Sequence, residues 1–251
     1  MGSVYVRELS AGEVFRSIGT LYKENFWQTY LSYALPLLPG YALESYAMQI
    51  NSWSLLLVSF CLLSAGSLAC YTALALCISD ACLGNTPNLL RSVARTSRLT
   101  IPLVLTSIVQ SLAIFGGLLL LIVPGIVLAG WFVFAPIIVV LEGRSTVAAL
   151  RRSKMLVKGY FLKTFAMVAL LTAIVFGWGA IGSGLVTLLQ IASVQGVGHR
   201  GVIQLVAGTI QYILISLSLP IIFIALILMY YDLRARKEAY DNTVLAAELA
   251  R

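Results

Sequence analysis

Six long apolar stretches, separated by short charged or polar segments, constrain the fold of this chain more than any other feature. An α-helix rises about 1.5 Å per residue, so roughly 20 apolar residues cross the hydrocarbon core of a bilayer, which is about 30 Å thick. The pattern therefore predicts an all-α polytopic membrane protein with six transmembrane helices. These helices are expected at residues 26–48, 53–79, 101–123, 126–141, 164–189 and 202–231.

The composition favours a membrane protein over a soluble one. Hydrophobic residues make up 60% of the chain and charged residues 11%, and the mean hydropathy is +0.94. A soluble globular chain needs more polar residues than this to cover its surface. The apolar stretches use most of the chain, so residues 1–251 are expected to form a single membrane domain. Arg7, Glu8, Glu13 and Arg16 leave no apolar core for a cleavable signal peptide ahead of the first stretch.

Three of the apolar stretches follow a basic segment. These segments are residues 14–26, 89–99 and 149–161. On a helix, Arg91, Arg95 and Arg98 share one face, because they follow one another at steps of four and three residues. The segments therefore predict basic amphipathic helices that lie in the membrane interface. The first is expected to begin at a capping box formed by Ser10 and Glu13.

The order of these segments indicates an internal repeat. Each of three units would hold a basic interfacial helix, a span that leaves the cytoplasm and a span that returns. The units are residues 10–84, 85–143 and 144–231, all boundaries being approximate, and a cytoplasmic tail follows at 232–251. The returning spans end in Asp80, Glu142 and Asp232, respectively. The fourth and sixth spans also share a Pro-Ile-Ile string, at 136–138 and 220–222.

The positive charges predict the orientation of the spans. Of the 17 Lys and Arg residues, all except Arg200 fall on one side of the expected membrane. Because positive charge accumulates in cytoplasmic loops, both termini and all three basic helices are expected in the cytoplasm. Anionic lipid headgroups are the expected partners, at about 1 kcal/mol per basic residue near the surface. Nucleic acid is not expected as a partner, because the basic residues lie beside apolar stretches rather than in a separate basic domain.

The sequence contains few candidate catalytic residues. The only histidine, His199, has no carboxylate or cysteine near it in sequence, so neither a catalytic site nor a metal site is expected, and no cofactor is indicated. The four cysteines lie in or beside one apolar stretch, where disulfides are not expected. Within the spans, Gln110, Gln204 and Gln211 are the candidate intramembrane polar residues. They either line a polar path or form hydrogen bonds between helices, and the second use is the commoner one.

The acidic residues at the ends of the returning spans need compensating charge, because a helix dipole disfavours a carboxylate at the C-terminus. The expected partners are Arg91 or Arg95 for Asp80; Arg144, Arg151 or Arg152 for Glu142; and Arg234, Arg236 or a basic helix for Asp232. One interpretation is a set of ordinary interfacial ion pairs. The other is a cytoplasmic polar ring that gates a path or binds an anionic group. The candidate ring is Asp80, Arg91, Arg95, Glu142, Arg151, Arg152, Asp232 and Arg234.

Four strings resemble the bacterial family known as the glycerophosphoryl diester phosphodiesterase membrane domain. They are LSAGEVFRSIGTLYKENF at 9–26, VPGIVLAGWFVFAPIIVVLEG at 123–143, ALRRSKMLVKG at 149–159 and YYDLRARKEAYD at 230–241. The resemblance implies a six-helix protein of the bacterial cytoplasmic membrane. In members with phosphodiesterase activity, that activity resides in a separate soluble barrel domain. The present sequence has no counterpart of its acidic ligands and histidines, so the resemblance assigns no catalytic residue here.

Two classes of function follow from these observations. The first is a non-enzymatic membrane protein, acting as an accessory or scaffold subunit or organising lipid. The second is a transporter or channel for a small or amphiphilic solute, for which the repeat, the prolines in the spans and the glutamines argue. An intramembrane enzyme would need a cluster of carboxylates or histidines that the sequence lacks. A dry core packed with Leu and Gly would favour the scaffold, and a continuous polar cavity reaching the membrane midplane would favour transport.

Overall fold

The computed structural model describes residues 8, 10–83, 89–193 and 200–238, and all regular secondary structure within these ranges is α-helical. The all-α prediction is confirmed for this part of the chain. The helices are α1 (Ala11–Glu24), α2 (Phe26–Gln49), α3 (Trp53–Cys82), α4 (Leu89–Leu120), α5 (Ile122–Phe132), α6 (Ala135–Glu142), α7 (Thr146–Val157), α8 (Phe161–Ser193) and α9 (Arg200–Glu238).

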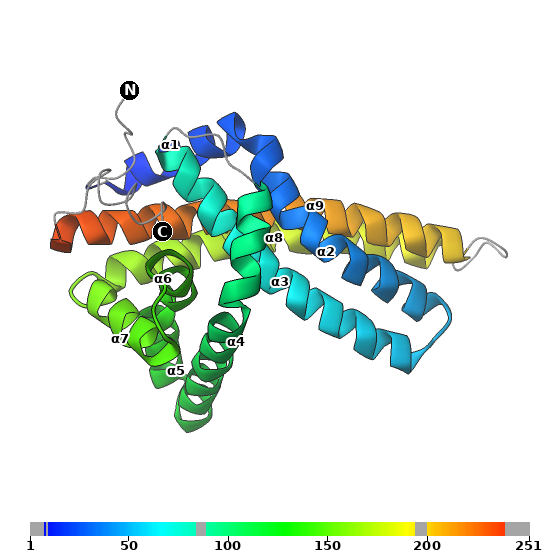
Figure 1. Cartoon of the computed structure of the whole chain (residues 1–251). Helices are drawn as coiled ribbons and strands as arrows, with labels where there is room; N and C mark the ends of the chain where they lie inside the picture. The colour runs from blue at the N-terminus through cyan, green and yellow to red at the C-terminus, as the bar shows by residue number, and fades with distance from the viewer. Residues whose placement is uncertain (1–7, 9, 84–88, 194–199, 239–251) are drawn as a thin grey trace.

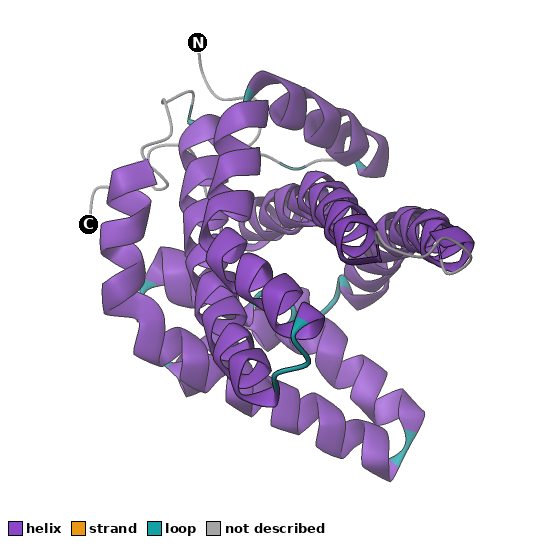
Figure 2. Cartoon of the chain, turned by 90° about the vertical axis from the view of Figure 1, so that its right-hand side faces the viewer, coloured by secondary structure: helices purple, strands orange, loops and turns teal. Residues whose placement is uncertain are grey.

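The helices form three long arms that extend from a common base (Figure 1). The arms are the helix pairs α2–α3, α4–α5 and α8–α9. The base consists of α1, α6, α7 and the C-terminal halves of α3 and α9. The α2–α3 and α8–α9 arms extend to the same side of the molecule, whereas the α4–α5 arm points in a different direction, as Figure 2 also shows. The first and last described helices, α1 and the end of α9, both lie in the base.

The hydrophobic core lies in the base rather than along the arms. Leu74, Phe134, Ile137, Ile227 and Tyr231 are all fully buried there. By contrast, residues 119–123 at the tip of the α4–α5 arm are 70–80% exposed and entirely apolar. Exposed apolar surface of this kind is unfavourable in water and suits a hydrocarbon environment.

Five helical segments are long and apolar enough to cross a membrane. They are Trp53–Cys82, Leu99–Leu120, Ile122–Glu142, Phe161–Leu188 and Leu205–Glu238. The chain is therefore compatible with a multi-pass membrane protein. Helix α2, where the sequence predicts the first of the six spans, is not among them, because Tyr, Ser, Gln and Glu side chains lower its hydropathy.

The fourth expected span, residues 126–141, is not one continuous helix. It is divided between α5 and α6, with a break at residues 133–134. Pro136 contributes to the break because it has no N–H to donate to the preceding turn. Ser153 of α7 stabilises it: the Ser153 Oγ accepts from the Phe134 N–H at 3.2 Å and donates to the Trp131 carbonyl at 2.7 Å.

The Pro-Gly pair at residues 124–125 predicts a turn between the third and fourth spans, but the turn lies elsewhere. The chain reverses at Leu121, and Pro124 lies in the first turn of α5. Proline suits a first helical turn, because the N–H that it lacks would have no partner there. Gly125 instead packs closely against Gly117 of α4, so the two helices can approach.

The middle basic segment, residues 89–99, is not a separate interfacial helix as expected. It forms the first three turns of α4, which continues to Leu120. No glycine separates the basic segment from the apolar one, and Pro102 removes a single helical hydrogen bond without ending the helix. Farther along this helix the Thr106 hydroxyl donates to the Pro102 carbonyl at 2.7 Å.

The two other basic segments, residues 14–26 and 149–161, lie largely in the separate short helices α1 and α7. The predicted capping box of α1 is confirmed, since the Glu13 N–H donates to Ser10 Oγ and the Ser10 N–H donates to the Glu13 carboxylate. The apolar stripe of α1, which includes Val14 and Ile18, is buried in the core of the base. Ser145 occupies the N-cap position of α7 but its side chain makes no capping hydrogen bond. The sequence also predicts that Thr86 caps the helix that begins near residue 89, and Thr86 lies outside the described residues.

Candidate functional site

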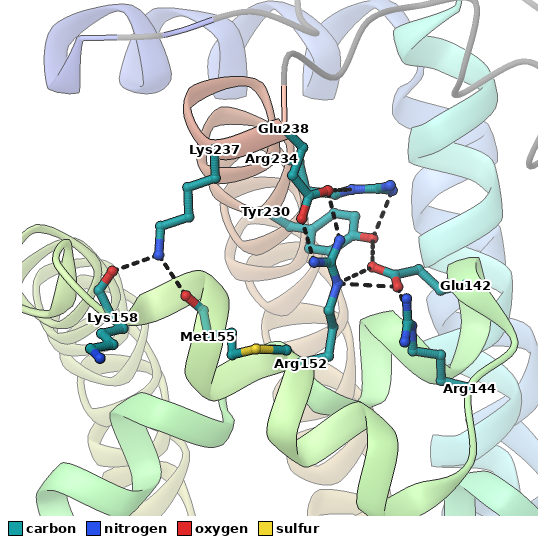
Figure 3. Close-up of polar contacts among 9 residues, drawn as sticks. All are labelled: Glu142, Arg144, Arg152, Met155, Lys158, Tyr230, Arg234, Lys237 and Glu238. Atoms are coloured by element: carbon teal, nitrogen blue, oxygen red, sulfur yellow. Dashed lines mark hydrogen bonds and ion pairs between the residues drawn. The ribbon is translucent and has the colours of Figure 1, made fainter.

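A cluster of charged side chains surrounds Glu142 at the base of the arms (Figure 3). The Glu142 carboxylate accepts hydrogen bonds from Arg144 Nε at 2.6 Å, Arg152 Nε at 3.2 Å and the Tyr230 hydroxyl at 2.9 Å. Only 6% of the Glu142 side chain is exposed. The Glu142 cluster comprises Glu142, Arg144, Arg152, Tyr230, Arg234 and Glu238.

The cluster continues from Arg152 to Glu238 near the end of α9. Arg152 Nη2 donates to Glu238 Oε2 at 2.6 Å, and Arg234 Nε donates to the same oxygen at 3.2 Å. Arg234 Nη1 also donates to the Tyr230 hydroxyl at 3.1 Å. Each of the two carboxylates therefore contacts two arginines, and the tyrosine joins both halves of the cluster.

Local structure explains how helices distant in sequence supply these groups. Gly143 ends α6 in the left-handed conformation, with φ of 64°, so the chain leaves the helix directly after Glu142. Helix α7 then runs back beside α6 and places Arg152 against the same carboxylate. On α9, Tyr230, Arg234 and Glu238 follow at steps of four residues and so share one face.

The electrostatics of the Glu142 cluster favour a structural role. Glu142 lies at the C-terminus of α6, where the helix dipole disfavours negative charge, and Arg144 and Arg152 compensate it. Burial lowers the pKa of Arg152, but hydrogen bonds and charge from Glu238 and Glu142 outweigh this effect and raise its pKa above the ordinary arginine value. The arrangement therefore joins α6, α7 and α9 through Glu142, Arg152 and Tyr230.

A second ion-pair group, the Asp232 cluster, lies on another face of α9. It comprises Asp232, Lys163, Arg236 and Glu8. The Asp232 carboxylate is 2% exposed and accepts from Lys163 Nζ at 2.7 Å and from Arg236 Nε at 2.9 Å. Arg236 also donates to Glu8 at 3.0 Å. This cluster ties α8 to α9 and places Glu8 beside α9.

Lys237 joins the end of α9 to the end of α7. Its Nζ donates to the backbone carbonyls of Met155 and Lys158, each at 2.5 Å (Figure 3). Carbonyls in the last turn of a helix have no partner within the helix, so a lysine there satisfies them and suits the helix dipole. Lys154 lies nearby, with its Nζ 4.1 Å from the centre of the Trp131 ring.

The structure brings some members of the predicted polar ring together and separates others. Glu142, Arg152 and Arg234 belong to one cluster, and Asp232 belongs to the other. Arg151 is exposed to solvent on α7. The remaining predicted members lie on α3 and α4: Asp80 is buried, with 8% exposed, and the side chains of Arg91 and Arg95 lie outside the described part of the chain.

Several residues of the two clusters were not predicted as site residues. These are Tyr230, Glu238, Lys163, Arg236, Arg144 and Glu8. Arg144 and Arg236 were expected only as partners of an acidic residue. The spacing of Tyr230, Arg234 and Glu238 was a usable signal, because three polar side chains at steps of four form a stripe on a helix.

The candidate intramembrane glutamines do not form one site. Gln110 lies on α4 and Gln211 on α9, in different arms, and the Gln204 side chain lies outside the described residues. The Oε1 atoms of Gln110 and Gln211 are both buried and have no hydrogen-bond partner among the described residues.

Neither a metal site among the described residues nor a related protein indicates a reaction or a ligand for these clusters. The described residues contain no group of three or more His, Cys, Asp or Glu side chains placed to hold a metal ion. Comparison of the chain with protein-family models, with curated proteins and with solved structures finds no match.

Proposed function

We propose that this chain is a non-enzymatic integral membrane protein of the bacterial cytoplasmic membrane that organises lipid, as a scaffold or an accessory subunit. The observation that carries the proposal is the combination of apolar, outward-facing arms with an exposed basic helix at their base. Such a molecule presents hydrocarbon-compatible surface and headgroup-compatible charge next to each other.

Helix α7 supports the lipid-facing part of the proposal. Its buried face carries Leu156 and Val157, which anchor it in the core of the base. Its other face exposes Arg151, Lys154 and Lys158. Because the helix is held by its apolar face, its cations stay available to anionic headgroups, each contributing about 1 kcal/mol.

The proposal includes a topology of six spans with both termini in the cytoplasm. Helix α2 is proposed as the first of the six spans, because it has 24 residues and packs against α3 in a hairpin. The three arms then correspond to the three proposed repeat units, with α1 and α7 as interfacial helices. The resemblance to the glycerophosphoryl diester phosphodiesterase membrane domain implies the same topology.

The interior of the base favours a scaffold over a transporter. Its large buried side chains are mainly aliphatic and aromatic, such as Leu74, Ile138 and Leu228. The charged groups around Glu142 and Asp232 are engaged with one another rather than directed at a cavity. A dry core of this kind stabilises a fixed arrangement of helices and offers no polar path.

One observation argues for a transporter or channel as a second candidate. The buried Oε1 atoms of Gln110 and Gln211 lack hydrogen-bond partners among the described residues. A buried polar atom without a partner is unfavourable, and a polar solute passing between the arms would satisfy it. Transport would require the α4–α5 arm to approach α9, so that both glutamines face one pathway.

Native mass spectrometry of the protein released from mixed phosphatidylglycerol and phosphatidylcholine nanodiscs tests the lipid-organising function. The variant Arg151→Gln/Lys158→Gln removes two exposed cations, and Arg151→Lys/Lys158→Arg is the control that keeps both charges. At about 1 kcal/mol each, we expect the Gln variant to lose roughly tenfold or more of its preference for phosphatidylglycerol, and the control to keep it.

Three outcomes distinguish the competing functions. Equal retention of phosphatidylglycerol by the wild type and the Gln variant would contradict the lipid-organising function. Solute flux in proteoliposomes that is abolished by Gln110→Leu would instead support the transporter. A protein that co-purifies at fixed stoichiometry would identify the chain as an accessory subunit.

A further inference from the structure

A small cavity lies between α2 and α9, at the end of the arms remote from the base. Its volume is about 220 Å³. It is lined by Tyr41, Glu44, Ser45, Met48 and Gln49 of α2 and by Leu205 and Gly208 of α9. Tyr41, Glu44, Ser45 and Met48 follow at steps of three and four or lie beside such a position, and so share the face of α2 that packs on α9.

The walls of this cavity are held in place by aromatic and backbone contacts. The rings of Tyr41 and Tyr212 stack with their centres 4.6 Å apart. The Tyr41 hydroxyl donates to the Gly208 carbonyl, and the Tyr212 hydroxyl donates to the Ala34 carbonyl. A side chain at position 208 would enter this space, since an added Cβ would lie 3.1 Å from Tyr41 Oη.

The chemistry of the lining selects for a cation. Glu44 is half-buried in a mostly apolar wall, and no ion pair to it is found among the described residues. A carboxylate placed in such surroundings is stabilised by a donor that brings positive charge. The neighbouring Tyr41 ring adds a surface that attracts cations.

The size and the donor set narrow the class of cation. A calcium ion binds about six to eight oxygen ligands, several of them usually carboxylates. The lining of this cavity offers a single carboxylate, that of Glu44, so it does not suit calcium. The cavity is also smaller than the roughly 300–1,000 Å³ of sites for drug-sized ligands. An ammonium group on a short alkyl chain fits the small volume and the single carboxylate, because it needs one carboxylate as counter-ion and an aromatic or apolar wall around its alkyl part.

We infer that this cavity is a binding site for an alkylammonium group, with Glu44 as its counter-ion. The group belongs either to a zwitterionic lipid headgroup such as phosphatidylethanolamine or to a free amine. The site goes beyond the proposed function, because it lies at the opposite end of the arms from the basic helix α7. The failure of one proposal therefore leaves the other standing.

Isothermal titration calorimetry on the full chain in detergent tests the site with three probes. They are ethanolamine hydrochloride, dihexanoylphosphatidylethanolamine and dihexanoylphosphatidylglycerol. Glu44→Gln removes the counter-ion without changing the shape, and Glu24→Gln is a matched control on the exposed face of α1. We expect Glu44→Gln to weaken the binding of the ammonium probes at least tenfold, and Glu24→Gln to bind as the wild type does.

The probes separate the two sources of the ammonium group. Tighter binding of dihexanoylphosphatidylethanolamine than of ethanolamine assigns the site to a lipid headgroup, and similar binding assigns it to a free amine. The inference is overturned if Glu44→Gln binds both ammonium probes as tightly as the wild type. It is also overturned if no ammonium probe binds, or if dihexanoylphosphatidylglycerol binds as tightly as dihexanoylphosphatidylethanolamine.

Discussion

Glu142, at the end of α6, and Asp232, within the C-terminal part of α9, are acidic residues that are almost completely removed from solvent. Their side chains are 6% and 2% exposed, and each contacts two basic side chains. Taking a charge out of water is unfavourable unless good geometry and further hydrogen bonds compensate. Removing one partner of such a pair is therefore more damaging than the net contribution of the pair suggests.

We expect Glu142→Gln to lower the free energy of unfolding by about 3 kcal/mol, because Arg152 would keep a buried charge with one carboxylate fewer to balance it. Reversible unfolding in mixed micelles measures the effect. Arg144→Gln is the control: its side chain is 48% exposed, so its loss is expected to change stability by less than about 1 kcal/mol. Equal stabilities for Glu142→Gln and Arg144→Gln would show that the cluster does not join the helices.

Part of this site was predictable from the sequence. A carboxylate at the end of an apolar span needs a cation, and the basic segment after Glu142 supplied candidates within ten residues. Arg144 and Arg152 are indeed its partners. Tyr230 was not predictable as a partner of Glu142, because it lies 88 residues away and only the packing of α6 on α9 brings the two together.

Helices α2 and α3 approach closely through glycines. Gly66 of α3 faces the Pro36 carbonyl of α2, and Gly40 of α2 faces Leu63 of α3. Without a hydrophobic force between helices in lipid, close backbone packing of this kind contributes much of their association. The two glycines therefore set how near the helices lie.

Gly66→Ala is expected to lower the free energy of unfolding by about 1–3 kcal/mol, because its Cβ would clash with the Pro36 carbonyl oxygen and separate the helices. Gly116→Ala is a matched control on α4, where no atom lies within 4 Å of the added Cβ. It is expected to leave stability unchanged or raise it by up to about 1 kcal/mol, since alanine favours a helix. The reverse order of stabilities in micelle unfolding would refute the packing role of Gly66.

The break between α5 and α6 depends on one hydroxyl from α7. Ser153 is fully buried and contacts the Phe134 N–H and the Trp131 carbonyl. We expect Ser153→Ala to lower the free energy of unfolding by about 2–4 kcal/mol, since two buried backbone groups lose their partner. Ser145→Ala, which removes a hydroxyl that makes no capping bond, should change it by less than about 0.5 kcal/mol. Circular dichroism during unfolding compares the two, and similar losses would contradict the role of Ser153.

In the molecule as a whole, packing is concentrated in the base while the arms expose apolar side chains. Residues 119–123 illustrate the contrast with fully buried residues such as Tyr230. In a bilayer, lipid covers the arms, so their stability comes from helical hydrogen bonds and from the pairing of helices within each arm.

The proposed six-span topology predicts which positions are reached from each side of the membrane. In a background with the four native cysteines replaced by serine or alanine, we expect Ser52→Cys and Leu121→Cys to react with an impermeant maleimide added to spheroplasts. Gly12→Cys and Lys158→Cys should react only after the membrane is opened. Labelling of both Gly12→Cys and Ser52→Cys from outside would show that α2 does not cross the membrane.

The sequence by itself determined the helical class of the protein, the position of most apolar helices and the need for cations beside Glu142 and Asp232. These follow from local rules, because backbone groups in hydrocarbon must bond within their own helix and buried charge must be balanced. Only the tertiary structure decided where α5 gives way to α6, that residues 89–99 continue into α4, and that Tyr230, Glu238 and Lys163 complete the clusters. Those outcomes depend on which helices pack together, and packing joins residues whose separation in sequence carries no local signal.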